Sequence, residues 1–422
     1  MPVNPWLTKG SKHLFDSSTA KLSPNANVSL HPNTSSAPSF LGKRNVKDVF
    51  IHASSAGKQL DDEQHIIAFN NRLCTLCSNL DNICIEDGEL VDPRVFTGFQ
   101  TVGFDNEGNN CYQNSVFQCL LHSPPFVLFL KKLNESSEPV DNPYAPFLTL
   151  FLRILSAMRS GVSESDGSSQ VCVHLQELRD LIAIKNCMFA EEQSDCHEFF
   201  LYLISEFAGE CQSVSQKQTS SIESEWEEIG SGGRRLELTV AKMDDCIINS
   251  IFETTLRKQQ SIYSRKQRME EQSYATLSLP IAGPDIQSVG DALSFFLNDT
   301  EGRYRIESTS PCLVLHLMRF SYDRVKQAPF KISKQVEFSR HLSLRDFDLG
   351  ERVRFTEYEL YAVITHKGGN ISNGHYIAFC READPNNWKR CDDESIRDVS
   401  FQEVLHTEPY MLFYFATGRE ES

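Results

Sequence analysis

The chain has 422 residues, 40% of them hydrophobic, so it can hold one large domain with a sizeable core or more than one ordinary domain. Its net charge of −16 argues against non-specific nucleic-acid binding, which needs Lys and Arg to displace counterions, and suits a basic partner better. No stretch predicts a signal peptide or a membrane span, and thirteen scattered cysteines are typical of reduced thiols, so we expect an intracellular protein that binds neither nucleic acid nor membrane.

The first 95 residues are expected to lie outside the main domain. Residues 1–45 are rich in Ser, Pro and Asn with few aromatic side chains, which predicts a disordered tail. Residues 46–95 form an N-terminal extension. Within it, apolar residues recur at near-helical spacing over residues 61–83, which predicts one amphipathic helix leading into the main domain.

Residues 96–417 change from helical to strand periodicity, and residues 418–422 form a short C-terminal tail. Helical spacing predicts helices over 114–122, 143–158, 174–183 and 194–208, with loop-like inserts at 161–170 and 216–235. Alternating β-branched and aromatic residues predict strands over 312–320, 334–339, 359–367, 374–382 and 410–415. Helices first and strands later predict an α+β protein whose two halves face each other across a cleft.

The stretch NEGNNCYQNSVFQCLL places Cys111 just before the helical pattern over 114–122, and if CYQNSVFQCLL, residues 111–121, is a helix, Cys111 occupies its first turn. Unpaired backbone N–H groups and the positive end of the helix dipole favour a thiolate there. The turn at residues 108–110 lets the backbone come close to a substrate. Asn106 and the backbone N–H of Cys111 are candidate donors to an oxyanion. Cys111 is therefore a candidate nucleophile, whereas Cys119, two turns further on, is interpreted as core packing.

A thiolate nucleophile needs a base, and the base needs a partner that orients it. His375 follows a glycine loop and begins an apolar strand, so it is the candidate base. His366, at the end of the preceding strand, lacks this context and is interpreted as an ordinary histidine. Asp392 and Asp393 lie one strand and one return strand further on, which allows an aspartate to reach His375.

These segments resemble the ubiquitin-specific proteases, a family of papain-like deubiquitinating enzymes. GFDNEGNNCYQNSVFQCLL is similar to the family's Cys box, and GHYIAFCRE with WKRCDDESIRDVS is similar to its His box. Further similar blocks follow the family's order, from about residue 97 to 416: EEQSDCHEFFLYLI, LVLHLMRFSYD, KISKQVEFS and EPYMLFYF. The resemblance implies a papain-like fold with a helical thumb, a β-sheet palm and fingers.

The resemblance also implies an activity, which is cleavage after the C-terminal glycine of ubiquitin without a cofactor. In this assignment Cys111 is the nucleophile and His375 is the general base and acid. Asp392 orients His375, with Asp393 assisting or substituting, and Asn106 stabilises the oxyanion. The expected partners are ubiquitin and ubiquitinated proteins.

A substrate-binding set follows from the same resemblance. In the family, acidic residues of the Gln-x-Asp helix contact arginines in the tail of ubiquitin, and the glycine loop before the histidine lines a narrow channel. The residues implied here are Gln193, Asp195, Glu198, Gly374 and Tyr376. A solvated helix face is the plainer interpretation of Asp195 and Glu198.

The zinc-binding cysteine pairs of many family members have no counterpart in this sequence. The matching segments, residues 252–281 and 291–311, contain no cysteine, which predicts shortened fingers without zinc. Cys74, Cys77 and Cys84 offer three ligands at most, so packing is favoured there as well.

Three functions are compatible with this pattern. The first is an active deubiquitinase, and the second is a catalytically inactive, ubiquitin-binding scaffold with the same fold. The third is a papain-like protease that cuts ordinary peptides or a ubiquitin-like modifier. All four catalytic positions hold competent residue types, which favours an active enzyme.

Overall fold

The structure is a computed structural model that describes most of the chain after residue 55. The described residues are 56–77, 85–86, 89–90, 93–96, 98–134, 141–160, 172–173, 175–189, 193–222, 246–259, 270–298, 303–323, 325–369 and 374–419. They all belong to one of the two units into which the chain divides, Asn45–Ser422. The predicted disordered tail at residues 1–45 therefore lies outside the described residues.

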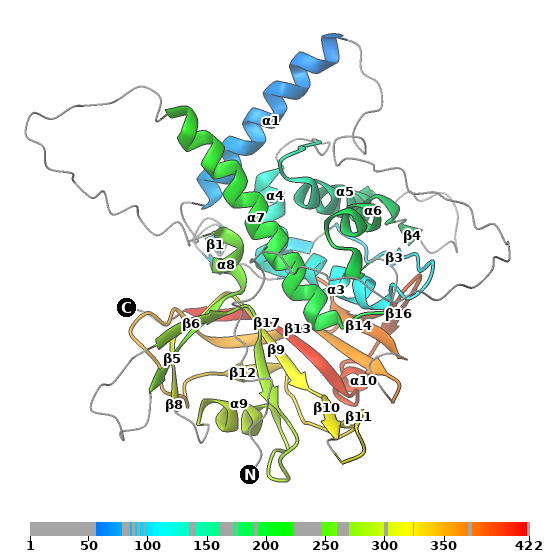
Figure 1. Cartoon of the computed structure of the whole chain (residues 1–422), viewed down its shortest axis with the longest axis vertical. Coiled ribbons are helices and arrows are strands. Elements are labelled where there is room, and N and C mark those ends of the chain that lie inside the picture. The colour runs from blue at the N-terminus through cyan, green and yellow to red at the C-terminus, as the bar shows by residue number, and fades with distance from the viewer. Residues whose placement is uncertain are drawn as a thin grey trace, which may run out of the picture. The chain divides into compact units, whose positions relative to one another are not determined.

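Helices make up the first half of this unit (Figure 1). Their bounds are α1 (Ala56–Cys77), α3 (Cys111–Leu121), α4 (Pro124–Leu133), α5 (Pro146–Ser160), α6 (Gln176–Lys185), α7 (Cys196–Ile222) and α8 (Ile247–Phe252). The long helix α7 packs against α1, α3, α5 and α8 and so joins the other helices together. Among the residues described, no helix combines the length and the apolar character that crossing a lipid bilayer requires.

The predicted helices are confirmed over the described residues, with shifted ends, and residues 78–83 of the first predicted helix lie outside the described part of the chain. Helix α1 begins before the predicted range, at Ala56, and α7 continues to Ile222, inside the segment predicted to be a loop. Helix α4 was missed, although it follows a recognisable rule. Its first two residues are Pro124 and Pro125, and proline is tolerated there because the first N–H groups of a helix have no internal partner.

The second half of the unit is an eight-stranded sheet. Its order is β16-β15-β14-β13-β17-β9-β7, with β12 paired to β13. All pairs are antiparallel except β7 with β9. The bounds are β7 (Leu277–Pro280), β9 (Cys312–Met318), β12 (His341–Ser343), β13 (Phe355–Lys367), β14 (His375–Arg381), β15 (Trp388–Asp392), β16 (Ser395–Val399) and β17 (Pro409–Arg419). Four of the five predicted strands correspond to β9, β13, β14 and β17.

The strand predicted at residues 334–339 is wrong. The segment is extended and buries Val336 and Phe338, which explains the alternating pattern. Its backbone, however, bonds to the chain around the start of helix α9 (Val289–Leu297). The N–H of Val289 donates to the carbonyl of Glu337, and the N–H of Glu337 donates to the carbonyl of Gln287. An extended segment that pairs at one point has the same side-chain alternation as a strand.

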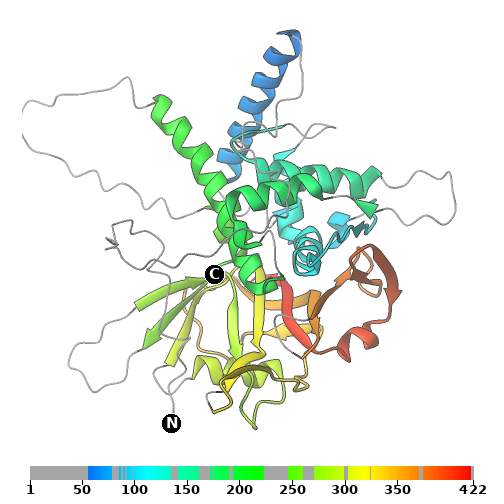
Figure 2. The same cartoon turned by 45° about the vertical axis from the view of Figure 1, so that its right-hand side comes forward.

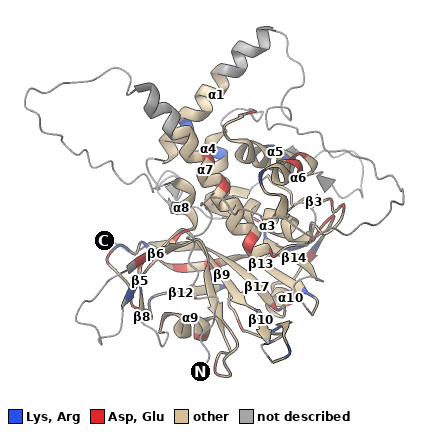
Figure 3. Cartoon of the chain, viewed as in Figure 1, with Lys and Arg blue, Asp and Glu red and all other residues tan. Residues whose placement is uncertain are grey.

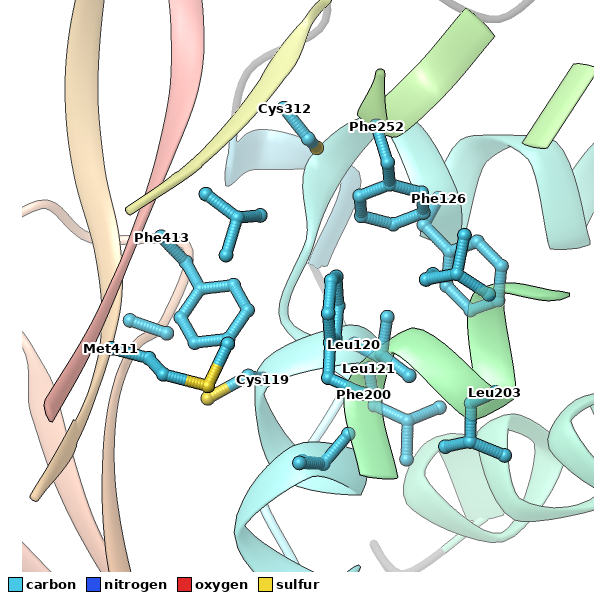
Figure 4. Close-up of a cluster of buried hydrophobic side chains, with 14 of the residues drawn as sticks. Cys119, Leu120, Leu121, Phe126, Phe200, Leu203, Phe252, Cys312, Met411 and Phe413 are labelled. Atoms are coloured by element: carbon cyan, nitrogen blue, oxygen red, sulfur yellow. The ribbon is translucent and has the colours of Figure 1, made fainter. Parts of the chain in front are cut away.

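The main core lies between the helices and the sheet. Helix α3 packs on β14 and also contacts β13 and β15 (Figure 1, Figure 2). Neither α3 nor β9 carries a charged residue (Figure 3). Side chains from α3, α4, α7 and α8 meet those of β9 and β17 in one apolar cluster (Figure 4), in which the rings of Phe200 and Phe413 lie 5.7 Å apart. Cys119 is fully buried here, which confirms its interpretation as packing.

The remaining strands form small sheets at the periphery. Strands β5 (Thr254–Gln259), β6 (Glu270–Tyr274) and β8 (Arg303–Ser308) make a three-stranded sheet in the region expected to form the fingers. Its strands contain no cysteine, and the absence of zinc stays a prediction. Strands β10 (Phe320–Asp323) and β11 (Ala328–Lys331) form a hairpin, and β3 (Gly103–Phe104) pairs with β4 (Cys172–Val173). In the eight-stranded sheet, α10 (Phe401–Leu405) connects β16 to β17.

Arg319 joins three segments beside the main sheet. The residue is fully buried, and its Nε donates to the carbonyl of Pro409 at 2.6 Å. Its Nη1 donates to the carbonyls of Ile332 and Lys334 at 2.9 and 2.8 Å. One guanidinium thus binds three backbone carbonyl groups from two segments that are distant in the sequence.

We expect Arg319→Met to lower the free energy of unfolding by about 3 kcal/mol, because it leaves buried carbonyl groups without donors. Urea denaturation of the purified chain measures this change. Arg345→Met is the matched control, since Arg345 has a side chain 61% exposed and pairs with Glu357 on the surface. Equal denaturation midpoints for the two variants would contradict the assignment.

Candidate active site

Cys111 is the first residue of α3, as the sequence predicts. Its side chain is 3% exposed and lies at the helix end where backbone N–H groups point out of the helix. Asn110 precedes it as the N-cap and makes no side-chain capping bond. Gly108 has a φ of 149°, a backbone conformation that other residues rarely adopt, so the turn before the helix needs a glycine. The thiol therefore sits in the favourable field of the helix dipole.

His375 and Asp392 lie at one end of two neighbouring strands. His375 begins β14 and Asp392 ends β15, and the antiparallel register brings the two ends together. The Nε2 of His375 is 2.5 Å from the Oδ1 of Asp392. Arg390 donates to the other carboxylate oxygen. Partial burial opposes ionisation of Asp392, but these bonds to His375 and Arg390 keep its pKa below the ordinary value.

The side chain of Cys111 lies close enough to the His375 ring to act on its charge. This interaction, opposed by partial burial and reinforced by Asp392, raises the pKa of His375 to about 9. The ring is therefore protonated at neutral pH and lies between two groups that favour its positive charge. Because Nε2 faces Asp392, Nδ1 is the nitrogen left for the sulfur. The three side chains form one continuous Cys–His–Asp chain.

Asn106 has a fixed amide orientation. Its Oδ1 accepts hydrogen bonds from the backbone N–H groups of Gly108 and Asn110 at 3.1 and 3.2 Å. Its Nδ2 donates to the Oδ2 of Asp393 at 2.7 Å. This bond needs only one of the two N–H groups on Nδ2, so the other is a candidate donor to a reacting oxygen. The two aspartates thus make different contacts: Asp392 binds His375, and Asp393 binds Asn106.

A close backbone approach holds Asp393 in this place. Asp393 has a φ of 53°, and its carbonyl accepts the N–H of Phe104 at 3.0 Å. A Cβ on Gly103 would lie 2.3 Å from the carbonyl oxygen of Glu394, so only glycine fits there. Sequence reasoning missed Gly103, since a glycine before an apolar residue carries no special signal.

Gly374 is held between Gln193 and His366. The Nε2 of Gln193 donates to the carbonyl of Gly374 at 2.6 Å. A Cβ on Gly374 would lie 1.8 Å from the Nε2 of His366, so no side chain fits. His366 is 3% exposed, and burial with the nearby cation of Lys331 lowers its pKa to about 4. His366 is thus a buried neutral ring directly against Gly374, a supporting position that sequence reasoning did not recognise.

The other predicted substrate-binding residues differ in their exposure. Asp195 is 8% exposed, caps α7 through the N–H groups of His197 and Glu198, and accepts the hydroxyl of Tyr410 at 2.5 Å. Tyr376 is 1% exposed and packs its ring against His366 and Tyr410, so its side chain does not face solvent. Glu198 is exposed. Reduced solvation by surrounding protein and the carboxylate of Asp195 raise the pKa of Glu198.

One group in the described part of the chain has ligand atoms close enough for a metal ion, namely His375, Asp392 and Asp393, within 4.8 Å of one another. Hydrogen bonds already engage these atoms: His375 with Asp392, and Asp393 with Asn106 and Asn114. The three side chains are therefore arranged by hydrogen bonds to one another and to the two asparagines. Cys74 and Cys77 are instead residues of α1, which packs against α7, and the Sγ of Cys74 is 3.7 Å from the Oγ of Ser215 in α7.

Comparisons with known proteins identify the family. A family model described as "Ubiquitin carboxyl-terminal hydrolase" matches residues 102–414. Ubiquitin carboxyl-terminal hydrolase 24 of Arabidopsis thaliana is 28% identical over 361 residues, which cover 75% of this chain and 64% of that protein. Ubiquitin hydrolase B of Dictyostelium discoideum is 27% identical over 238 residues, 52% of each chain. This chain thus spans about half to two thirds of the length of these two relatives.

The fold has solved counterparts as well. The SAGA Ubp8/Sgf11/Sus1/Sgf73 DUB module bound to ubiquitin aldehyde contains a chain that matches with a TM-score of 0.59 at 21% identity, over 82% of this chain and 74% of that one. The form without ubiquitin aldehyde matches with a TM-score of 0.58. The α+β class predicted from the sequence is therefore confirmed. The chain belongs to the ubiquitin carboxyl-terminal hydrolase family, with the fold of the ubiquitin-specific proteases.

Proposed function

We propose that this chain is a cysteine-type deubiquitinase that hydrolyses the isopeptide or peptide bond after the C-terminal glycine of ubiquitin. The observation that carries the proposal is the continuous contact from Cys111 through His375 to Asp392 at a helix N-terminus. Family membership and the likeness to a chain bound to ubiquitin aldehyde support ubiquitin as the substrate. We further propose that it acts inside the cell on ubiquitinated proteins.

The mechanism follows from the positions of the protons. The Cys111 thiolate adds to the carbonyl carbon of the terminal glycine, and the carbonyl oxygen becomes an oxyanion. Asn106 Nδ2 and the backbone N–H of Cys111 donate to that oxygen. Protonated His375 gives its Nδ1 proton to the departing lysine amine, which leaves a thioester on Cys111. A water then loses a proton to His375 and attacks the thioester, releasing the ubiquitin carboxylate and restoring the thiolate–imidazolium pair.

The charge around the site suits a basic substrate tail. Glu198 lies exposed in the first turn of α7, five residues after Gln193, which bonds the carbonyl of Gly374, and the whole chain carries a net charge of −16. We propose that Glu198 contacts the arginines of the tail of ubiquitin, with Gln193 and Gly374 beside its glycines. Asp195 would act mainly through the field of its carboxylate, because both of its oxygens already accept hydrogen bonds within the protein.

The proposal is tested by covalent capture with ubiquitin carrying a C-terminal propargylamide, an electrophile that reacts with an active-site thiolate. The full chain should form one adduct, and Cys111→Ala should form none. Cys187→Ala is the matched control, because Cys187 is an exposed thiol outside the site and its loss should leave capture unchanged. Hydrolysis of a fluorogenic ubiquitin amide provides the turnover rate.

Other outcomes distinguish the competing functions. Binding of ubiquitin without capture or turnover would indicate an inactive scaffold. Preferential capture by the corresponding probe of a ubiquitin-like modifier would indicate a different substrate. Capture that persists in Cys111→Ala would mean that another cysteine is the nucleophile, and the proposed mechanism would be wrong.

A further inference from the structure

A buried ion pair lies directly beside Asn106. Asp105 is 4% exposed, and its Oδ1 is 2.9 Å from the Nη1 of Arg179, a residue of α6 that is 9% exposed. The second terminal nitrogen of Arg179 donates to the backbone carbonyl of Asp105. The N–H of Leu175 also donates to the Asp105 carboxylate, at 3.1 Å. Both the side chain and the backbone of Asp105 are thus tied to α6.

The same arginine reaches the amide of Asn114, the fourth residue of α3. The Nη2 of Arg179 donates to the Oδ1 of Asn114 at 3.4 Å. The Nδ2 of Asn114 donates to the carbonyl of Asp105 at 3.0 Å and to the Oδ1 of Asp393 at 2.8 Å. Because Arg179 can only donate, it fixes the oxygen of Asn114 toward itself and the Nδ2 of Asn114 toward Asp393.

We propose that Arg179 is a positioning residue for the oxyanion donor Asn106. The contact runs from Arg179 through Asn114 to one oxygen of Asp393, whose other oxygen holds Asn106. A second contact fixes Asp105, the residue before Asn106. An oxyanion donor acts best when it is already oriented, because it then needs no rearrangement as charge develops on the oxygen. This inference rests on the proposed function.

The test compares turnover with covalent capture. Asp105→Asn/Arg179→Met removes both charges, so that no unpaired carboxylate is left buried. We expect kcat on a fluorogenic ubiquitin amide to fall about 10-fold with KM within about 2-fold of wild type, because losing a whole oxyanion donor costs about 100- to 1,000-fold. Capture by ubiquitin propargylamide should keep its rate, since that adduct forms without an oxyanion. Arg153→Met, at a half-buried arginine of α5 paired with Glu177, is the matched control.

A double-mutant cycle separates positioning from general stability. In an Asn106→Ala background the same double substitution should cause no further loss of kcat, because the donor that it positions is already gone. An equal loss in both backgrounds, or wild-type kcat in the folded double variant, would overturn the inference. Arg179→Lys serves as a second variant if the first does not fold. It keeps the positive charge but not the fork of donors, so kcat should fall about 3-fold. An unchanged kcat in this variant would also overturn the inference. If wild type itself neither turns over nor is captured, the proposed function fails instead.

Discussion

His375→Ala is expected to reduce hydrolysis of a ubiquitin amide by about 10,000-fold or more, while the affinity for ubiquitin stays largely unchanged. The variant loses both the cation beside the Cys111 sulfur and the proton donor for the leaving amine. These two losses affect the chemical step, whereas the surface that would bind ubiquitin is untouched. The effect should therefore appear in kcat, and the equilibrium dissociation constant for free ubiquitin should match that of wild type.

The measurement needs both a rate and an affinity. Steady-state turnover gives the rate, and titration of ubiquitin against Cys111→Ala and Cys111→Ala/His375→Ala gives the affinity without reaction. His406→Ala is the matched control, because His406 is exposed and its ring bonds only locally to the carbonyl of Gln402. Normal turnover in His375→Ala would show that another residue is the base. His366, buried against Gly374, would then be the nearest alternative.

The candidate triad was predictable because each member leaves a local signal. Cys111 stands at the start of an amphipathic helix, His375 follows a glycine loop, and the two aspartates end a strand. Their meeting depends on contacts between α3, β14 and β15 that no local pattern encodes. The ordered blocks that resemble one family supplied this long-range information.

The local sequence does not distinguish Asp392 from Asp393; only the family resemblance assigned Asp392 to His375, and the contact of Asp393 with Asn106 was not foreseen. Adjacent carboxylates at the end of a strand are equivalent in sequence, and the positive φ of Asp393 turns its side chain toward Asn106 instead of His375. The pairing of Asp105 with Arg179 was missed for a related reason. An acid in a loop and a base in a helix are ordinary by themselves, and only the packing of α6 against the loop brings them together.

Asp392→Asn and Asp393→Asn should both lower kcat, and for different reasons. Asp392→Asn removes the anion that supports protonated His375, and kcat should fall by about 100- to 10,000-fold. Asp393→Asn weakens the hold on Asn106 and Asn114, and kcat should fall by up to about 100-fold. Capture by ubiquitin propargylamide should slow in Asp392→Asn and remain fast in Asp393→Asn, because only the first aspartate acts on the thiolate–imidazolium pair.

The pH dependence of hydrolysis separates the two roles most sharply. The raised pKa of His375, about 9, means that the imidazolium needed by the leaving amine is present below that pH and is lost above it. Wild-type hydrolysis should therefore decline as the pH rises through about 9. Asp392→Asn should move this decline to lower pH, because a neutral neighbour no longer favours the charged ring. Asp393→Asn should leave it in place, and a shift in that variant instead of the other would mean that Asp393 is the partner of the histidine in solution.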